Sequence, residues 1–410
     1  MEQKRRVVFT LYAYIFMIGF AVSGTMFSTV LPKIIGDYKL TLAQAGLFSV
    51  FTSSGNLIAM VITGMLGDRY RKSILMGIVF LGMSVTLTLI GLEPPFFLLL
   101  CFLVLLGVCS SILNLIVTAY VSDLYGDGRA KYINLVHMFY GVGSLVGPLY
   151  PMLLSQSGFR WKYSYLFLAG IVMAIGISYF VVMKNLKEPA LSIGRNTLKE
   201  KQEAASFQSW RNLFHYKGMI ALCIMSFLYM GGHQNTFSTW FQTYLQTENA
   251  QIYTEEFTSI CMTLYWIGMV ISRTISASVS QKIAPREFIL AGSLGGVAAM
   301  TLGMLFQVPW VWVLSVMALG ICTGAVYPLT FAISCAWFPD ASAKVSSVVG
   351  IFTSVGSMFC GWLVGKIANS VSFYFAMFIP WVSLAVVFLI VWRCFPKKQK
   401  DFCIQRERAR

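Results

Sequence analysis

Charged side chains are scarce in this chain of 410 residues: Asp, Glu, Lys and Arg make up 11% of it, whereas hydrophobic residues make up 57%. So little charge cannot cover the surface of a soluble domain of this size. Apolar runs of about twenty residues or more, each long enough to cross a bilayer as a helix, recur along the whole chain. The composition therefore predicts an all-α, polytopic integral membrane protein and excludes a nucleic-acid-binding module.

Metal-binding and cofactor-binding patterns are also missing. The nine cysteines fall mostly inside apolar runs and form no C-x-x-C pair, which is typical of reduced packing residues. The sequence contains no Gly-rich phosphate loop and no recognisable Ser/His/Asp set. We therefore expect no metal, no cofactor and no enzymatic activity.

Twelve apolar runs are predicted to be membrane helices. They cover residues 7–31, 43–66, 74–91, 95–122, 133–155, 161–183, 217–245, 256–279, 287–306, 309–335, 344–367 and 372–395. The longest connection, residues 185–216, is polar and typical of a linker. It separates an N-terminal half of six helices (1–184) from a C-terminal half of six (217–395), and residues 396–410 form a tail.

The basic residues predict that both termini are cytoplasmic. An even number of spans places the two termini on one side, and most Lys and Arg residues outside the spans fall on that side. The opposite side has only Lys33, Lys39, Arg160 and Lys162. This topology accounts for the formal charge of +15 without a nucleic-acid partner. Met1 to Arg6 lead directly into the first run, which we expect to be retained as a helix. The short loops fit a bacterial inner-membrane carrier.

The two halves share short sequence matches at one constant offset of 213 residues. Gly107-Val-Cys is matched by Gly320-Ile-Cys, and Val142-Gly-Ser by Val355-Gly-Ser. Agreement at a single offset favours an internal duplication. Two pseudo-symmetric six-helix bundles are a recurring transporter architecture, with the substrate site between the halves near the middle of the membrane.

One acidic pattern leaves an enzyme open as an alternative. Asp123-x-x-x-Asp127 ends an apolar run, and acidic clusters on cytoplasmic loops bind magnesium diphosphates in membrane prenyltransferases. Such enzymes need two acidic loops, and the counterpart loop has only Asp340. A solvated turn explains Asp123 and Asp127 more simply.

The run Asn134–Pro148 places polar residues and repeated glycines inside a predicted span. A buried histidine in a membrane helix, such as His137 here, is a candidate functional residue. The glycines allow neighbouring helices to approach closely. In the tenth run, Pro328 frees a backbone carbonyl and permits a bend beside Tyr327, the repeat counterpart of Asn114.

The seventh run carries a second polar group. His233, Trp240 and Tyr244 share one face of an ideal helix with Phe237. Aromatic rings beside amide groups suit a polar, uncharged ligand such as a sugar. The alternative is a packing stripe with Trp240 and Tyr244 in the outer interfacial belt. The candidate substrate contacts are therefore Asn114, Asn134, His137, His233, Gln234, Asn235, Trp240 and Tyr327.

The loop after the second run, from Gly64 to Ser73, reads G-M-L-G-D-R-Y-R-K-S. It resembles the G-x-L-x-D-R-x-G-R-K loop of the major facilitator superfamily, although one residue shorter. The resemblance implies a gating role, in which Asp68 latches onto neighbouring helices and the basic residues meet lipid headgroups. A basic turn that obeys the positive-inside rule is the alternative; it explains Arg71 and Lys72 but not Asp68. The candidate gating residues are Asp68, Arg69, Arg71, Lys72 and Arg273.

Asn134-x-x-His137, with the glycines and proline up to Pro148, resembles the fucose permease-like sugar:proton symporter branch of that superfamily. The branch implies buried carboxylates on helices one and four, but no Asp or Glu lies deep in any run here, and helix four offers Asn114. His137 is the candidate replacement, because an imidazole titrates near neutral pH. A neutral, hydrogen-bonded histidine is the alternative. Gly143-x-x-x-Gly147-Pro148 also resembles the fifth-helix signature of drug:proton antiporters, which leaves the direction of transport open.

Arg273 is a charged residue inside the eighth run. It could gate the second half, as the resemblance implies, snorkel to the interface, or bind an anion. The sequence as a whole predicts a monomeric secondary transporter in the lipid bilayer that moves a small sugar-like solute by proton symport or facilitated diffusion. The alternatives are a multidrug or metabolite efflux antiporter, a membrane prenyltransferase, and a non-transporting receptor.

Overall fold

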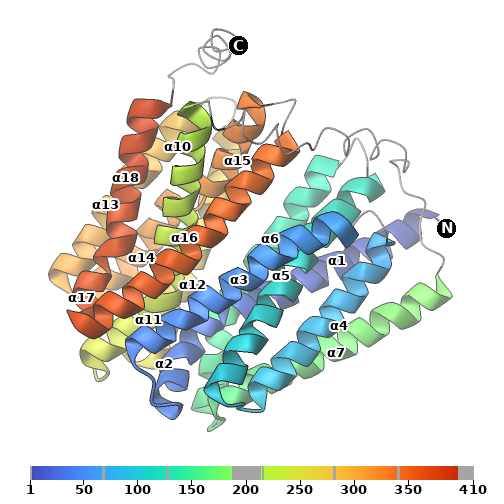
Figure 1. The fold of residues 1–410 in the computed structure, drawn as a ribbon, viewed down its shortest axis with the longest axis horizontal. Helices are drawn as coiled ribbons and strands as arrows, with labels where there is room; N and C mark the ends of the chain where they lie inside the picture. The colour runs from blue at the N-terminus through green and yellow to red at the C-terminus, as the bar shows by residue number, and fades with distance from the viewer. Residues whose placement is uncertain are drawn as a thin grey trace. The chain divides into compact units, whose positions relative to one another are not determined.

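The computed structural model describes residues 2–66, 70–125, 129–186, 214, 217–279, 283–338 and 342–395, and every regular element in them is helical (Figure 1). Ten of the segments are long and apolar enough to cross a membrane. α3 and the interrupted helix that begins at Lys217 complete twelve spans. The predicted twelve-helix architecture is confirmed in the part of the chain that the structure describes.

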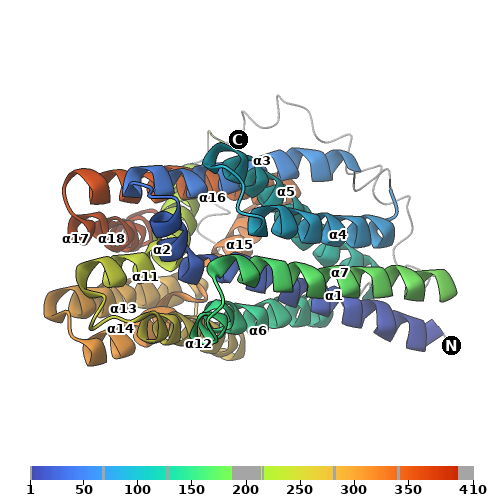
Figure 2. The ribbon, with the colours of Figure 1, turned by 90° about the horizontal axis from the view of Figure 1, so that it is seen from below.

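The chain divides into two compact units, Met1–Thr197 and Leu198–Arg410. The spans of unit 1 are α1 (Glu2–Thr25) with α2 (Phe27–Asp37), α3 (Leu42–Leu66), α4 (Lys72–Gly91), α5 (Phe96–Tyr125), α6 (Arg129–Gln156) and α7 (Trp161–Asn185). α1 packs on α6, α3 on α5, and α4 on α7 (Figures 1 and 2). The first span is longer than predicted and is interrupted at Met26.

Unit 2 contains the other six spans. They are α10 (Lys217–Ser226), η2 (Phe227–Asn235) and α11 (Thr236–Asn249); α12 (Glu255–Val279); α13 (Pro285–Phe306); α14 (Pro309–Thr323) with α15 (Val326–Trp337); α16 (Ser342–Ser370); and α17 (Phe373–Ala376) with α18 (Phe378–Cys394). The prediction of a regular seventh helix is wrong for the middle of this span, where η2 is a π-helix of nine residues. η2 packs on α16, and α12 packs on α14.

One helix crossing is repeated in the two units at the offset found in the sequence. A methyl group added to Gly107 of α5 would lie 2.2 Å from the Thr52 carbonyl oxygen of α3. A methyl group added to Gly320 of α14 would lie 2.2 Å from the Tyr265 carbonyl oxygen of α12. Both members of the second pair lie 213 residues after those of the first. The duplication therefore extends to the backbone contact that sets the distance between the helices.

A second helix crossing is also repeated in the two units at this offset of 213 residues. In unit 1, a methyl group on Gly143 of α6 would lie 2.6 Å from the Ile18 carbonyl oxygen of α1. In unit 2, a methyl group on Gly231 of η2 would lie 2.2 Å from the carbonyl carbon of Gly356 in α16. The glycines predicted to bring helices together do so here.

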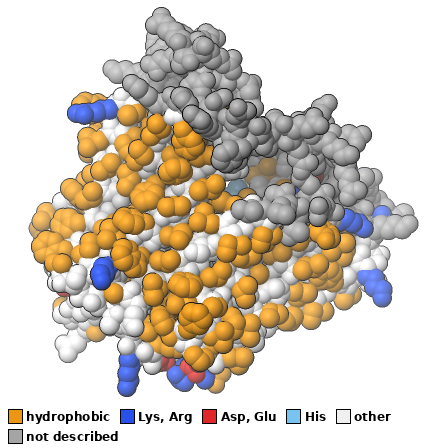
Figure 3. All heavy atoms as spheres, viewed as in Figure 1, with side chains coloured by type: hydrophobic (Ala, Val, Ile, Leu, Met, Phe, Trp, Pro, Cys, Tyr) orange, Lys and Arg blue, Asp and Glu red, His pale blue; other side chains and the backbone are white. Residues whose placement is uncertain are grey.

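The surface of the helices is apolar, as a lipid environment requires. Figure 3 shows hydrophobic side chains spread over much of the visible surface, with Lys and Arg side chains mainly near its edges. Large residues such as Val142 and Ile171 are exposed although they lie near the middle of α6 and α7. The protein is a multi-pass integral membrane protein.

Candidate functional site

The polar residues of unit 1 lie on α5 and α6. Asn114 of α5 is half-buried, and its side-chain amide makes no hydrogen bond to another described residue. Asn134 and His137 of α6 are exposed. The expectation that His137 is buried is therefore wrong: α6 turns Gly143 toward α1, while His137 lies on the exposed stripe that also carries Met138.

The π-helix η2 holds His233 in a stack of aromatic rings. Its ring centroid lies 5.9 Å from that of Tyr229 and 6.1 Å from that of Phe237, and the side chain is fully buried. The Pro380 carbonyl lies near the imidazole, but neither ring nitrogen makes a hydrogen bond of acceptable geometry to the described residues. An unpaired buried polar side chain is rare and often marks function.

Local sequence and packing explain the wide turn of η2. Gly231 and Gly232 give the backbone freedom at the point where it meets α16. The Thr236 hydroxyl donates a hydrogen bond of 2.6 Å to the Gly231 carbonyl, five residues earlier. A hydroxyl inserted into the backbone ladder is a known cause of such irregularities, and π-helical turns are frequent at functional sites.

The other candidates in the seventh span divide into bonded and unbonded groups. The Gln234 Oε1 atom is buried and unpaired among the described residues, whereas Asn235 Nδ2 donates to Ser357 Oγ at 2.7 Å. Trp240 is fully buried, and its indole nitrogen donates to the Gly361 carbonyl at 3.1 Å. Trp240 therefore neither offers a face for a sugar nor lies in an interfacial belt, since its ring is enclosed by α16 and by Phe373.

The predicted bend in the tenth span is confirmed, since α14 ends at Thr323 and α15 begins at Val326. Pro328 has no N–H to offer the Gly324 carbonyl four residues earlier, and the Nε atom of Arg273 donates to that carbonyl at 3.2 Å. The Tyr229 hydroxyl donates to the neighbouring Thr323 carbonyl at 2.5 Å. Sequence reasoning missed Tyr229, because its position on the seventh helix does not reveal which carbonyl it meets.

Tyr327 lies just beyond the bend. Its side chain is half-buried, and its ring centroid lies 4.9 Å from that of Phe331 in an edge-to-face contact. The structure therefore brings Arg273 and Tyr229 together at the bend of the tenth span, close to Tyr327 in the sequence. A charged side chain at an irregular membrane helix can orient a solute in the membrane, whereas the Tyr229 hydroxyl supports the bend through the Thr323 carbonyl.

The comparisons with known proteins now identify the family. The family model for the Major Facilitator Superfamily matches residues 13–253 and 248–406. The chain belongs to the Major Facilitator Superfamily. It is therefore a secondary transporter of a small organic solute and not an enzyme, which excludes the prenyltransferase alternative.

Relatives of this superfamily member are distant in sequence. The cis,cis-muconate transport protein of Acinetobacter baylyi is 22% identical over 387 residues, which cover 86% of this chain and 89% of the relative. A solved D-xylose-proton symporter superposes with a TM-score of 0.76 at 13% identity, covering 95% and 97% of the two chains. The Escherichia coli fucose:proton symporter gives a TM-score of 0.63 at 17% identity, covering 94% and 98%. These structures share the fold.

The predicted gating loop of this superfamily transporter is described only in part. Asp68 and Arg69 lie outside the described residues, and Arg71 is exposed just before α4. Lys72 forms an ion pair of 2.5 Å with Asp123 of α5, and each side chain is only 16% exposed. Asp123 is therefore wrongly predicted as a solvated turn residue: it joins the start of α4 to the end of α5.

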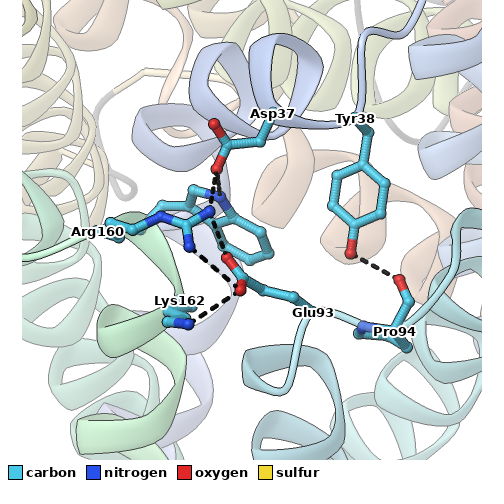
Figure 4. Close-up of polar contacts among 7 residues, drawn as sticks. Asp37, Tyr38, Glu93, Pro94, Arg160 and Lys162 are labelled. Atoms are coloured by element: carbon cyan, nitrogen blue, oxygen red, sulfur yellow. Dashed lines mark hydrogen bonds and ion pairs between the residues drawn. The ribbon is translucent and has the colours of Figure 1, made fainter.

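A cluster of charged residues connects the helix ends of unit 1 that lie opposite to the Lys72–Asp123 pair (Figure 4). Arg160 lies 2.9 Å from Asp37 and 2.8 Å from Glu93, and Lys162 lies 2.9 Å from Glu93. Trp161 donates a hydrogen bond of 2.8 Å to Asp37. The hydrogen bond to Asp37 raises the pKa of Arg160 above its ordinary value. Sequence reasoning placed these residues at span ends but gave no sign that they meet.

We expect Arg160→Met to destabilise this superfamily transporter modestly. The substitution breaks both contacts of the guanidinium and leaves the two carboxylates close to each other, but the groups are solvated, so the fall in unfolding temperature should be small. Thermal unfolding in detergent measures this loss of stability, and the difference in unfolding temperature between variant and native chain should be smaller in high salt. Lys39→Met is the matched control, because Lys39 is exposed and forms none of these pairs. Equal falls in unfolding temperature for the two substitutions would contradict a stabilising role of the cluster.

Proposed function

We propose that this transporter moves a small polar organic solute across a bacterial inner membrane by alternating access, with both termini in the cytoplasm. The observation that carries the proposal is the presence of half-buried polar groups inside apolar spans. The side-chain amide of Asn114 in α5 makes no hydrogen bond to a described residue, and Tyr327, its repeat counterpart, is half-buried in α15. Groups of this kind are expensive in a membrane unless they serve a solute.

An organic acid is the solute class that we favour. One relative is named as a transport protein for cis,cis-muconate, which is a dicarboxylate. Arg273 places a positive charge inside α12, and no carboxylate of a described residue pairs with it. A neutral, sugar-like solute is the second candidate, supported by the branch-level motif and by the amides of Asn114 and Asn134.

Uptake into liposomes tests the proposal. The purified, full-length chain is reconstituted with and without an imposed pH gradient, and radiolabelled cis,cis-muconate and xylose are offered separately. Accumulation of either solute above the level in protein-free liposomes supports secondary transport, and dependence on the pH gradient supports proton symport. Failure to transport or exchange any member of a broad panel of acids, sugars and drugs would refute the proposal, whereas export of drugs alone would favour the antiporter.

His137 is proposed to carry the coupled proton, because the described spans contain no carboxylate deep inside them: Asp123 lies at the end of α5 and is paired with Lys72. His137→Ala should abolish accumulation driven by the pH gradient while preserving exchange of labelled for unlabelled solute. Met138→Ala is the matched control, since it removes a neighbouring exposed side chain that does not titrate. Equal loss of accumulation and exchange in His137→Ala would reject a role limited to coupling.

A further inference from the structure

No carboxylate of a described residue is paired with the positive charge of Arg273. Arg273 lies six residues before the end of α12 at Val279, and its side chain is half-buried. Among the described residues of unit 2, Glu287 is paired with Arg286, and Glu255 lies at the far end of α12. A charge held inside a membrane span is costly unless a partner or a ligand offsets it.

The bend in the tenth span fixes the orientation of the Arg273 guanidinium. Its Nε atom is anchored on the Gly324 carbonyl, which Pro328 leaves without a helical donor. A guanidinium carries five N–H groups in a planar fork. The anchor uses the Nε side, and neither Nη atom is paired with a described residue or fully buried. The two Nη groups therefore remain available in a fixed direction.

A second donor lies in the same region. Tyr265 of α12 is fully buried, and the positive charge of Arg273 acts on its hydroxyl. That hydroxyl lies near the Thr323 side chain, but its geometry is too poor for a hydrogen bond to any described residue. A buried hydroxyl without a partner is destabilising and is satisfied when a ligand supplies an acceptor.

We propose that the Nη groups of Arg273 bind a carboxylate of the transported solute, with the Tyr265 hydroxyl as a neighbouring donor. The planar fork of arginine matches the two oxygens of a carboxylate, which a lysine ammonium cannot do. The site assigns a chemical class to the solute: it carries at least one carboxylate. This inference rests on the proposed transport function and deepens it by naming the donors that hold the carboxylate.

The experiment must separate solute binding from support of the bend. Arg273→Gln removes the charge but keeps an amide that can reach the Gly324 carbonyl. Arg273→Lys keeps the charge and loses the fork. Tyr229→Phe is the matched control, because it removes the donor to the other carbonyl of the bend, Thr323, without changing any charge.

Uptake of cis,cis-muconate and of xylose is measured with each reconstituted variant, together with the thermal unfolding of each. Arg273→Gln should raise the KM for muconate by about tenfold or more, and Arg273→Lys should raise it less. Tyr229→Phe should lower the unfolding temperature without a comparable change in this KM. A muconate KM unchanged in Arg273→Gln, or changed equally in Tyr229→Phe, would overturn the carboxylate site.

The outcome for the native chain separates the two proposals. Uptake of xylose without binding or uptake of any carboxylate would overturn the carboxylate site and leave secondary transport standing. Uptake of no solute of any class would refute transport itself. Binding of muconate, detected as a shift in unfolding temperature that Arg273→Gln abolishes, would support the site even if reconstitution failed.

Discussion

Replacing Gly320 with valine should destabilise unit 2 severely. The added Cβ would lie 2.2 Å from the Tyr265 carbonyl oxygen, and this obstacle is backbone, which no side-chain rotation can move. α14 and α12 must then separate along their crossing, so other contacts between them are lost. We expect a loss of about 3 kcal/mol, or a fall in unfolding temperature of about 10 °C.

Gly170→Val provides the control for this prediction. Gly170 lies within α7, and nothing lies within 4 Å of a Cβ added there. The same substitution should therefore leave the unfolding temperature nearly unchanged. Gly107→Val should behave like Gly320→Val, because it meets the Thr52 carbonyl at the same distance of 2.2 Å. A Gly320 variant as stable as the Gly170 variant would contradict the close crossing.

Gly231→Ala should abolish transport or slow it by at least about tenfold, since a one-ångström displacement can cost two orders of magnitude in rate. A Cβ at Gly231 would lie 2.2 Å from the Gly356 carbonyl carbon, so η2 would be pushed off α16. The Asn235–Ser357 hydrogen bond, one residue beyond this contact on α16, would lengthen or break. Initial rates of solute uptake in liposomes measure the effect.

Gly232→Ala is the matched control in the next residue of η2. A Cβ there meets the Ser383 Oγ atom at 2.2 Å and the Ser383 Cβ atom at 2.9 Å; rotation of the serine side chain relieves the first contact but not the second. We therefore expect a smaller loss of transport than in Gly231→Ala, and Ser383→Ala should restore part of it in the double variant. If Gly232→Ala is as damaging as Gly231→Ala and is not rescued, the loss follows from any added side chain in this turn of η2 and not from the contact with α16.

The sequence anticipates features that follow from local chemistry. Residue types and their spacing predict the span pattern, the offset that relates Gly107 to Gly320, and the bend before Pro328. The π-helix is not predicted from them, because its widened turn also packs through the Gly231–Gly356 contact between distant segments. An ideal helical wheel therefore placed Trp240 on a ligand face, whereas the folded chain encloses it.

The candidate site likewise combines features that the sequence predicts with features that only the fold reveals. The sequence identifies Arg273 as an unusual charge in a span, but only the folded chain shows that it binds the carbonyl freed by Pro328. The sequence alone does not show which face of α6 packs on α1. His137 was therefore expected to be buried. The Arg160 cluster was missed because its members come from three separate turns that meet only in the folded unit.

The imidazole of His233 has a consequence for the conformational equilibrium of the transporter. Burying its nitrogens without hydrogen bonds costs about 1–3 kcal/mol relative to a conformation that satisfies them. Any state in which water or solute reaches the ring recovers that free energy, and each 1.4 kcal/mol changes a population ratio about tenfold. Contact of the His233 ring with water or solute is therefore one free-energy contribution that favours opening of the seventh helix.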